Sequence, residues 1–216
     1  MNTVVFASIA FVATSASSAF AGLVNPLIAP WAGSGAAQFA QWDSFTSAFG
    51  GANLPDTAGS RPFSLMNFSP DAFITGAGNI YGPSSPLAIM IMGGTSAGQT
   101  PSQVVMNVAT LGNPIPPTGV RLSLFDNMGN SISLAPASTE VRSDAPVPPQ
   151  GSARTVAYTW NTASMPFAAT GFRIDINGAP SNMSLDAVRL DLNFVPAPGA
   201  FAIMAVAAMG SRRRRA

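Results

Sequence analysis

The side chains that perform most enzyme chemistry are missing from this chain, which has neither cysteine nor histidine among its 216 residues. A cysteine nucleophile, a Ser-His-Asp triad, a histidine acid or base and a Cys/His zinc site are therefore excluded. What remains is a lysine-free serine mechanism or carboxylate chemistry, in which two carboxyl groups about 5–10 Å apart hydrolyse glycosidic bonds. The single glutamate, Glu140, is expected in a loop. No catalytic residue, metal or cofactor is assigned, and a secreted carboxylate-dependent glycoside hydrolase is kept as the alternative function.

Two aromatic residues, Tyr158 and Trp160, form a candidate ligand platform. They lie two positions apart in a segment with strand character, so both rings are expected on the same face of a sheet. If that face is exposed, the rings can stack on sugar rings, and the partner would be an exopolysaccharide. If that face is buried, the two rings belong to the core.

The charged residues argue against nucleic acid as a partner. Four of the ten basic residues stand together at the end of the chain: Arg212, Arg213, Arg214 and Arg215. The rest of the chain has six arginines and nine acidic residues, so its net charge is −3, and it has no cluster of basic residues. The expected arrangement of these charges on a sheet is cross-strand pairing on a solvated face. The aspartates in question are Asp175, Asp186 and Asp191, and the arginines are Arg173 and Arg189.

The middle of the chain is predicted to be all-β. Twenty glycines and nineteen prolines divide it into short segments that rarely leave room for ten helical residues. Segments such as 120–125 and 188–194 alternate apolar and polar residues, which gives each strand one wet and one buried face. We therefore expect one domain over residues 22–194, an antiparallel two-sheet sandwich of the jelly-roll kind. Strands are predicted at 63–68, 72–75, 87–92, 103–110, 120–125, 131–134, 154–160, 171–176 and 185–194.

Two local features complete this prediction. A hairpin is expected over residues 124–131, where Gly129 supplies a positive φ and Asp126 or Asn127 caps the turn. Asp126, Asn127 and Asn130 lack the spacing and the glutamate of an EF-hand, so capping is preferred to calcium binding. The aromatic residues of the segment 36–49 recur every three to four positions, which predicts a helix over a sheet; the alternative is a looser segment tucked against the sandwich.

The N-terminus is predicted to be a signal peptide over residues 1–21. An apolar run from residue 4 to 13 is followed by small residues and by Ala19-Phe20-Ala21, a cleavage pattern of the A-x-A type. Cleavage is expected after Ala21. The partners implied are the export machinery and a signal peptidase.

The C-terminal tail, residues 195–216, has the order of a temporary membrane anchor. Pro196 and Pro198 prevent a helix from running back into the last strand. The uncharged stretch that follows is expected to form a short hydrophobic helix, because a helix pairs its own backbone in lipid. Residues 199–210 would rise roughly 18 Å, less than a bilayer core. Translocation would be stopped by the four consecutive arginines, Arg212, Arg213, Arg214 and Arg215.

This tail resembles the PEP-CTERM sorting signal, also called the ice-binding protein C-terminal domain. Val195, Pro196, Ala197, Pro198 and Gly199 are similar to its planctomycete form, although Ala197 stands where the family usually has glutamate. Residues 41–45 are also similar to the starts of other such passengers. The resemblance implies export, transient anchoring in the inner membrane, recognition by an exosortase-type transpeptidase, and transfer to the cell surface or extracellular matrix. The expected function is therefore that of an exported surface or matrix protein with a non-catalytic passenger, a candidate polysaccharide binder.

Overall fold

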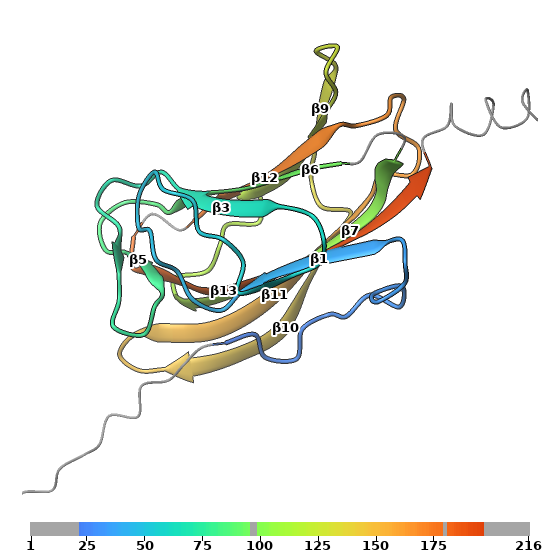
Figure 1. Ribbon diagram of the computed structural model, residues 1–216. Helices are drawn as coiled ribbons and strands as arrows, with labels where there is room; N and C mark the ends of the chain where they lie inside the picture. The colour runs from blue at the N-terminus through green and yellow to red at the C-terminus, as the bar shows by residue number, and fades with distance from the viewer. Residues whose placement is uncertain (1–21, 96–98, 179–180, 197–216) are drawn as a thin grey trace, which may run out of the picture.

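The computed structural model describes residues 22–95, 99–178 and 181–196 (Figure 1). Within these ranges, no helix is long and apolar enough to cross a lipid bilayer. Several predicted features lie outside the described residues. They are the signal peptide with Ala19 and Ala21, the motif residues Ala197, Pro198 and Gly199, the short hydrophobic helix, and the arginine stop of Arg212, Arg213, Arg214 and Arg215.

The described chain forms two antiparallel sheets packed as a sandwich, which confirms the predicted all-β class (Figure 1). The large sheet has the order β10 (Ser138–Val147), β11 (Gly151–Asn161), β7 (Gln99–Gly112), β13 (Met183–Pro196), β1 (Ala37–Trp42), β2 (Thr57–Ala58). At one end of this sheet, β5 (Ile80–Gly82) pairs with β13, and β4 (Phe73–Ile74) pairs with β5. The small sheet has the order β3 (Phe63–Asn67), β6 (Ala88–Gly94), β12 (Gly171–Asn177), β8 (Val120–Phe125), β9 (Ser131–Leu134).

The core lies between the two sheets and follows the predicted alternation. In β8, Leu122 and Leu124 are fully buried while Arg121 is exposed. In β13, which belongs to the large sheet, Leu190 and Leu192 are also fully buried and pack in the same core. Each such side chain contributes about 1.5–3 kcal/mol to stability when it leaves water, so the alternating residues fix which face of each strand turns inward.

The predicted helix over residues 36–49 is wrong, because its first part is strand β1. Ala40 and Trp42 are fully buried in the core, whereas Phe39 points to the other face and is 36% exposed. This two-residue alternation lets β1 pair with β13 from Ala37↔Asn193 to Trp42↔Val188. The aromatic spacing of the segment also fits a helix, but pairing with the buried strand β13 satisfies its backbone and buries Trp42 at the same time.

The nine predicted strands are all present, and four further strands are found in the described ranges: β1, β2, β5 and β10. The missed strand β10 is an edge strand that continues through Pro146, which is paired with Ser152 of β11. Glu140, which was expected in a loop, therefore lies on a strand. An edge position tolerates proline because its missing N–H faces solvent instead of a ladder partner.

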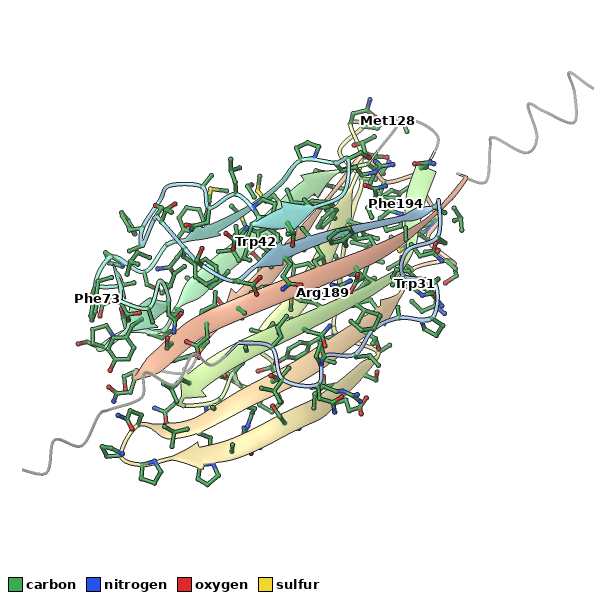
Figure 2. The ribbon with its side chains drawn as sticks, turned by 60° about the horizontal axis from the view of Figure 1, so that its bottom comes forward. Trp31, Trp42, Phe73, Met128, Arg189 and Phe194 are labelled. Atoms are coloured by element: carbon green, nitrogen blue, oxygen red, sulfur yellow. The ribbon has the colours of Figure 1, made fainter. Side chains whose placement is uncertain are left out.

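The segment before β1 lies along the outer face of the large sheet (Figure 2). The backbone N–H of Leu27 donates to Oδ1 of Asn107, and Nδ2 of Asn107 donates back to the Leu27 carbonyl, at 2.7 and 3.0 Å. The N–H of Val24 donates to the Thr155 hydroxyl at 3.0 Å. These bonds satisfy Asn107, which would otherwise be a buried and unpaired amide.

Strand β13 changes partners along its length. From Val188 to Asn193 it pairs with β1, whereas from Met183 to Leu185 it pairs with β5. Between these two stretches the register to β7 shifts, so that Asp186 is an extra residue without a ladder partner. A β-bulge of this kind bends a strand and turns a side chain away from the regular pattern.

Candidate functional site

Tyr158 and Trp160 do share a face, but that face is buried, so the pair is not a ligand platform. Their exposed fractions are 2% and 3%, and the rings stack with centroids 6.4 Å apart. Trp160 Nε1 donates to the carbonyl of Leu134 in the small sheet at 3.3 Å. Burial also raises the pKa of Tyr158 to about 12. The physical reason is that these rings fill the space between β11 and the small sheet, where water is excluded.

Two of the five motif residues belong to the folded domain. Val195 and Pro196 continue β13 opposite Thr100 and Gln99 of β7. Val195 is 38% exposed. The regular strand therefore extends to Pro196, the first proline of the motif, two residues beyond the predicted domain boundary.

The charged residues considered for hydrolysis and for cross-strand pairing all lie on strands. Glu140 lies on the edge strand β10 with an exposed side chain and pairs with Arg142 of the same strand. The charged pairs predicted across strands are formed within strands instead: Arg173 with Asp175 at 2.9 Å, and Arg189 with Asp191 at 2.8 Å. In the described part of the chain, no group of three or more acidic side chains could hold a metal ion.

Of the two residues predicted as caps, Asp126 is the one that caps the β8–β9 turn. Its Oδ1 accepts the N–H groups of Met128 and Asn130, both at 2.9 Å, and its Oδ2 accepts Asn130 Nδ2 at 2.7 Å. The hydrogen bond from the Asn130 side chain is the main reason that the pKa of Asp126 lies below its ordinary value. Gly129 has the expected positive φ of 90°. These oxygens are already used by the turn, which supports capping over cation binding.

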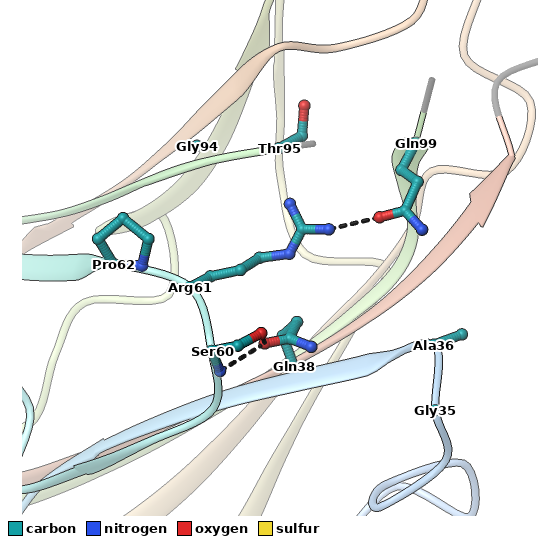
Figure 3. Close-up of a pocket in the computed structure, with 9 residues that line it drawn as sticks. All are labelled: Gly35, Ala36, Gln38, Ser60, Arg61, Pro62, Gly94, Thr95 and Gln99. Carbon is teal, nitrogen blue, oxygen red and sulfur yellow. Dashed lines mark hydrogen bonds between the residues drawn. The ribbon is translucent and has the colours of Figure 1, made fainter. Parts of the chain in front are cut away.

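One pocket lies at the end of the sandwich where β13 finishes, and we call it the Arg61 pocket (Figure 3). It has a volume of about 480 Å³ and lies between β1, the segment before β3, and the facing ends of β6 and β7. Arg61 donates to Gln99 Oε1, and its guanidinium lies 4.2 Å from the ring centroid of Phe194. Burial lowers the pKa of Arg61, which remains a cation. This guanidinium is therefore held in place by groups of the protein itself.

A larger pocket of about 820 Å³ lies at the opposite end of the large sheet, and we call it the Phe73 pocket. One wall is the β4–β5 hairpin, with Phe73, Asn79 and Tyr81. The second wall is the β10–β11 turn, and the floor is formed by the end of β7 and the start of β13. Figure 2 shows Phe73 at one end of the molecule and Phe194, two residues before Pro196, at the other.

The two aromatic rings of the hairpin wall are arranged edge to face, with centroids 5.4 Å apart and planes at 77°. Phe73 is 48% exposed. The Tyr81 hydroxyl donates to Oδ1 of Asn182 at 3.0 Å. Asn182 has a positive φ of 53°, a left-handed conformation that asparagine tolerates better than most residues. The hydroxyl thus connects the aromatic wall to a polar residue on the floor.

Behind this pocket lies the bulged residue Asp186, which is 3% exposed. Its Oδ1 accepts hydrogen bonds from Asn79 Nδ2 and from the Ser184 hydroxyl, both at 2.6 Å, and these two donors line the pocket. Its Oδ2 has no hydrogen-bond partner among the described residues. Burial raises the pKa of Asp186 to about 7, partly opposed by the Ser184 hydrogen bond.

The Phe73 pocket contains none of the residues predicted as a site. Its hairpin wall carries Phe73, Thr75, Asn79 and Tyr81. Within each arm of the hairpin the two residues are two positions apart, so their side chains lie on the same face. That alternation could have indicated a polar and aromatic face. The opposite wall and the floor come from segments about 30 to 110 residues further along the chain, and no local pattern brings these together.

No protein-family model and no curated protein matches the chain. Solved structures similar to it include the tailspike protein 4 enzymatically active domain of bacteriophage CBA120, with 10% identity and a TM-score of 0.28 over 75% of this chain and 19% of that one. The C-terminal extracellular domain of Mycobacterium tuberculosis EmbC has 16% identity and a TM-score of 0.30, over 82% and 62%. A cyclase from Fischerella sp. TAU has 12% identity and a TM-score of 0.24, over 74% and 85%. The chain thus spans less than two thirds of the first two proteins, and these distant similarities assign it no activity.

Proposed function

We propose that this chain is an exported cell-surface or extracellular-matrix protein with a non-catalytic sandwich passenger. A signal peptide over residues 1–21 would direct export, with cleavage after Ala21 by a signal peptidase. Residues 195–216 would anchor the protein transiently in the inner membrane. An exosortase-type transpeptidase would then recognise Pro196 to Gly199 and transfer the protein outward.

The observation that best supports this proposal is the position of the motif relative to the folded domain. β13 is a central strand of the large sheet and stays paired up to Pro196. The two prolines of the motif, Pro196 and Pro198, cannot donate backbone hydrogen bonds, which makes this part of the sequence a poor ladder strand. A processing enzyme that recognises Pro196 to Gly199 would then act directly at the edge of the folded domain.

The jelly-roll kind of sandwich also remains a proposal. It is supported by the way the chain alternates between layers: β1 and β2 are in the large sheet, β3 is in the small sheet, β4 and β5 are in the large sheet, β6 is in the small sheet, and β7 is again in the large one. The hydrolase alternative has less support, because Glu140 lies on the open surface of an edge strand.

Mass spectrometry of the protein recovered from cells and from the medium tests the proposal. We expect mature ends near Gly22 and near Pro198. A truncated variant that lacks residues 197–216 keeps the whole of β13. It should therefore fold but lose its retention at the cell surface. Its thermal unfolding provides the control for folding. Intact termini, or unchanged location and processing of the truncated protein, would contradict the proposal.

A further inference from the structure

The Phe73 pocket has the size and the chemistry of a binding site for a small number of sugar rings. Its volume of about 820 Å³ falls within the range of roughly 300–1,000 Å³ that is usual for small-molecule sites. Its hairpin wall exposes aromatic surface at Phe73, which folding leaves uncovered. The ring of Tyr81 holds that of Phe73 edge to face, so the exposed face has a defined orientation.

The polar groups around this aromatic wall are uncharged. Amides come from Asn79, Asn113 and Asn182, and hydroxyls come from Thr75 and Ser184. None of the described residues that line the pocket carries a formal charge. Amides and hydroxyls both donate and accept hydrogen bonds, which suits a ligand whose own groups are hydroxyls. A phosphate or a uronate would find no cation to pair with here.

Several of these groups are held by the protein while part of their hydrogen-bonding capacity stays free. Asn113 Nδ2 donates to the Ser181 carbonyl at 2.8 Å, which leaves its Oδ1 as an acceptor. Asn182 Oδ1 accepts the Tyr81 hydroxyl, and its Nδ2 has no partner among the described residues. Asn79 donates to the buried Asp186 at 2.6 Å, which leaves its carbonyl oxygen available. Amides fixed in this way lose little rotamer freedom when a ligand binds.

The floor of the pocket contains a close backbone contact at two glycines with positive φ, Gly112 at 99° and Gly151 at 109°. A Cβ on Gly112 would lie 2.1 Å from the Asn182 carbonyl oxygen, and a Cβ on Gly151 would lie 3.1 Å from Gly112. Three segments therefore meet by backbone alone at this point. Side chains here would prevent the close approach that forms the pocket.

We infer that the Phe73 pocket binds a neutral oligosaccharide segment, with sugar rings stacked on Phe73 and Tyr81 and their hydroxyls bonded to Asn79, Asn113 and Asn182. Asp186 is a positioning residue, since it acts through Asn79 and Ser184. This inference rests on the proposed function, because an exported matrix protein meets polysaccharide outside the cell. The pocket lies at the start of β13, whose fourteen residues extend about 45 Å to the Pro196 end. A tail that anchors the protein at Pro196 would leave the pocket facing away from the membrane.

The test is binding of the full chain in mild detergent to immobilised neutral gluco-, manno-, galacto- and xylo-oligosaccharides, with oligoguluronate as the acidic probe. We expect retention on at least one neutral series and none on oligoguluronate. Phe73→Ala should weaken binding by at least about tenfold, because it removes the stacking ring. Tyr81→Phe keeps the ring but frees Asn182, so it should weaken binding by about threefold to tenfold.

Phe49→Ala is the matched control, because Phe49 is also an exposed phenylalanine, at 55%, and does not line the pocket. It should bind as the unmodified protein does. Unfolding curves of all variants exclude misfolding. No retention on any neutral series, retention on oligoguluronate alone, or unchanged binding by folded Phe73→Ala and Tyr81→Phe would each overturn the inference. Because binding is measured on purified protein, its failure would leave the processing and location experiment unaffected.

Discussion

The two ends of strand β13 bury a carboxylate in different ways. Towards Pro196, Asp191 lies in the regular part of the ladder and receives two hydrogen bonds from Arg189, at 2.8 and 2.9 Å. Towards Met183, Asp186 lies in the bulge and receives only the neutral donors of Asn79 and Ser184. Asp186 is 3% exposed and Asp191 is 1% exposed. The first end is compensated by charge, whereas the second leaves a carboxyl group that is easier to bury when protonated.

This difference shows what each end of the sheet can do. At the Pro196 end, the guanidinium of Arg189 compensates the buried carboxylate of Asp191 and so stabilises the regular pairing of β13. A carboxyl group that holds an amide and a hydroxyl by one oxygen orients the polar lining of a pocket. The bulge makes the second arrangement possible, because it places Asp186 where neither β1 nor β5 pairs with it.

The largest expected effect tests the bulged end, by Asp186→Asn. The folded-state pKa of Asp186 is about 7, above the 3.8 of the unfolded chain, so the folded state binds more protons between these values. Stability from this group is therefore complete below pH 3.8 and is lost as the pH rises towards 7. Asparagine resembles the protonated acid. The variant should match the unmodified protein near pH 4 and exceed its free energy of unfolding by about 4 kcal/mol at pH 8.

Urea unfolding at several pH values measures this difference. Glu140→Gln removes a carboxylate from the exposed edge strand and is the control for charge alone. Its pH profile should run nearly parallel to that of the unmodified protein. If the Asp186→Asn profile also ran parallel, Asp186 would be as easily ionised as a surface acid.

At the regular end, Arg189→Ala should leave Asp191 buried without its cation. The expected loss is about 3 kcal/mol, at the low end of the range for a broken buried pair, because Arg189 itself is partly exposed. Arg173→Ala breaks an equivalent pair with Asp175 at 2.9 Å on a solvated face, with side chains 48% and 31% exposed. That variant should lose less than about 1 kcal/mol. Equal losses in chemical unfolding would mean that burial does not distinguish the two pairs.

Strands such as β8 could be predicted from the sequence because their information is local. Arg121 and Ser123 alternate with Leu122 and Leu124, and burial of the leucines decides the face without reference to the rest of the chain. Strand β1 could not be predicted in this way, since the aromatic residues of its segment fit two periods. Pairing with β13, some 150 residues away, decides between them.

The candidate site depends still more on distant contacts. The sequence correctly predicts that Tyr158 and Trp160 share a face, but not that this face turns inward. For the Phe73 pocket, the decisive features are a bulge at Asp186 and a change of partner from β1 to β5, which are properties of pairing between segments about 100 residues apart. The turn at Asp126 needs only five neighbouring residues, and it was predictable in detail.

That turn extends the comparison to a third carboxylate, whose removal is expected to cost less than the changes at Asp186 and Arg189. Asp126, at 8% exposed, is compensated by three N–H donors instead of an arginine. Asp126→Ala removes all three bonds and should lower the free energy of unfolding by less than Arg189→Ala does. Because the folded-state pKa of Asp126 lies below its ordinary value, this contribution is present above pH 3.8 and is lost as the pH falls through the folded value, opposite in sign to Asp186. Asn127→Ala is the matched control, since Asn127 makes no side-chain hydrogen bond within the described residues, and equal losses from the two variants would contradict the assignment of Asp126 as the cap.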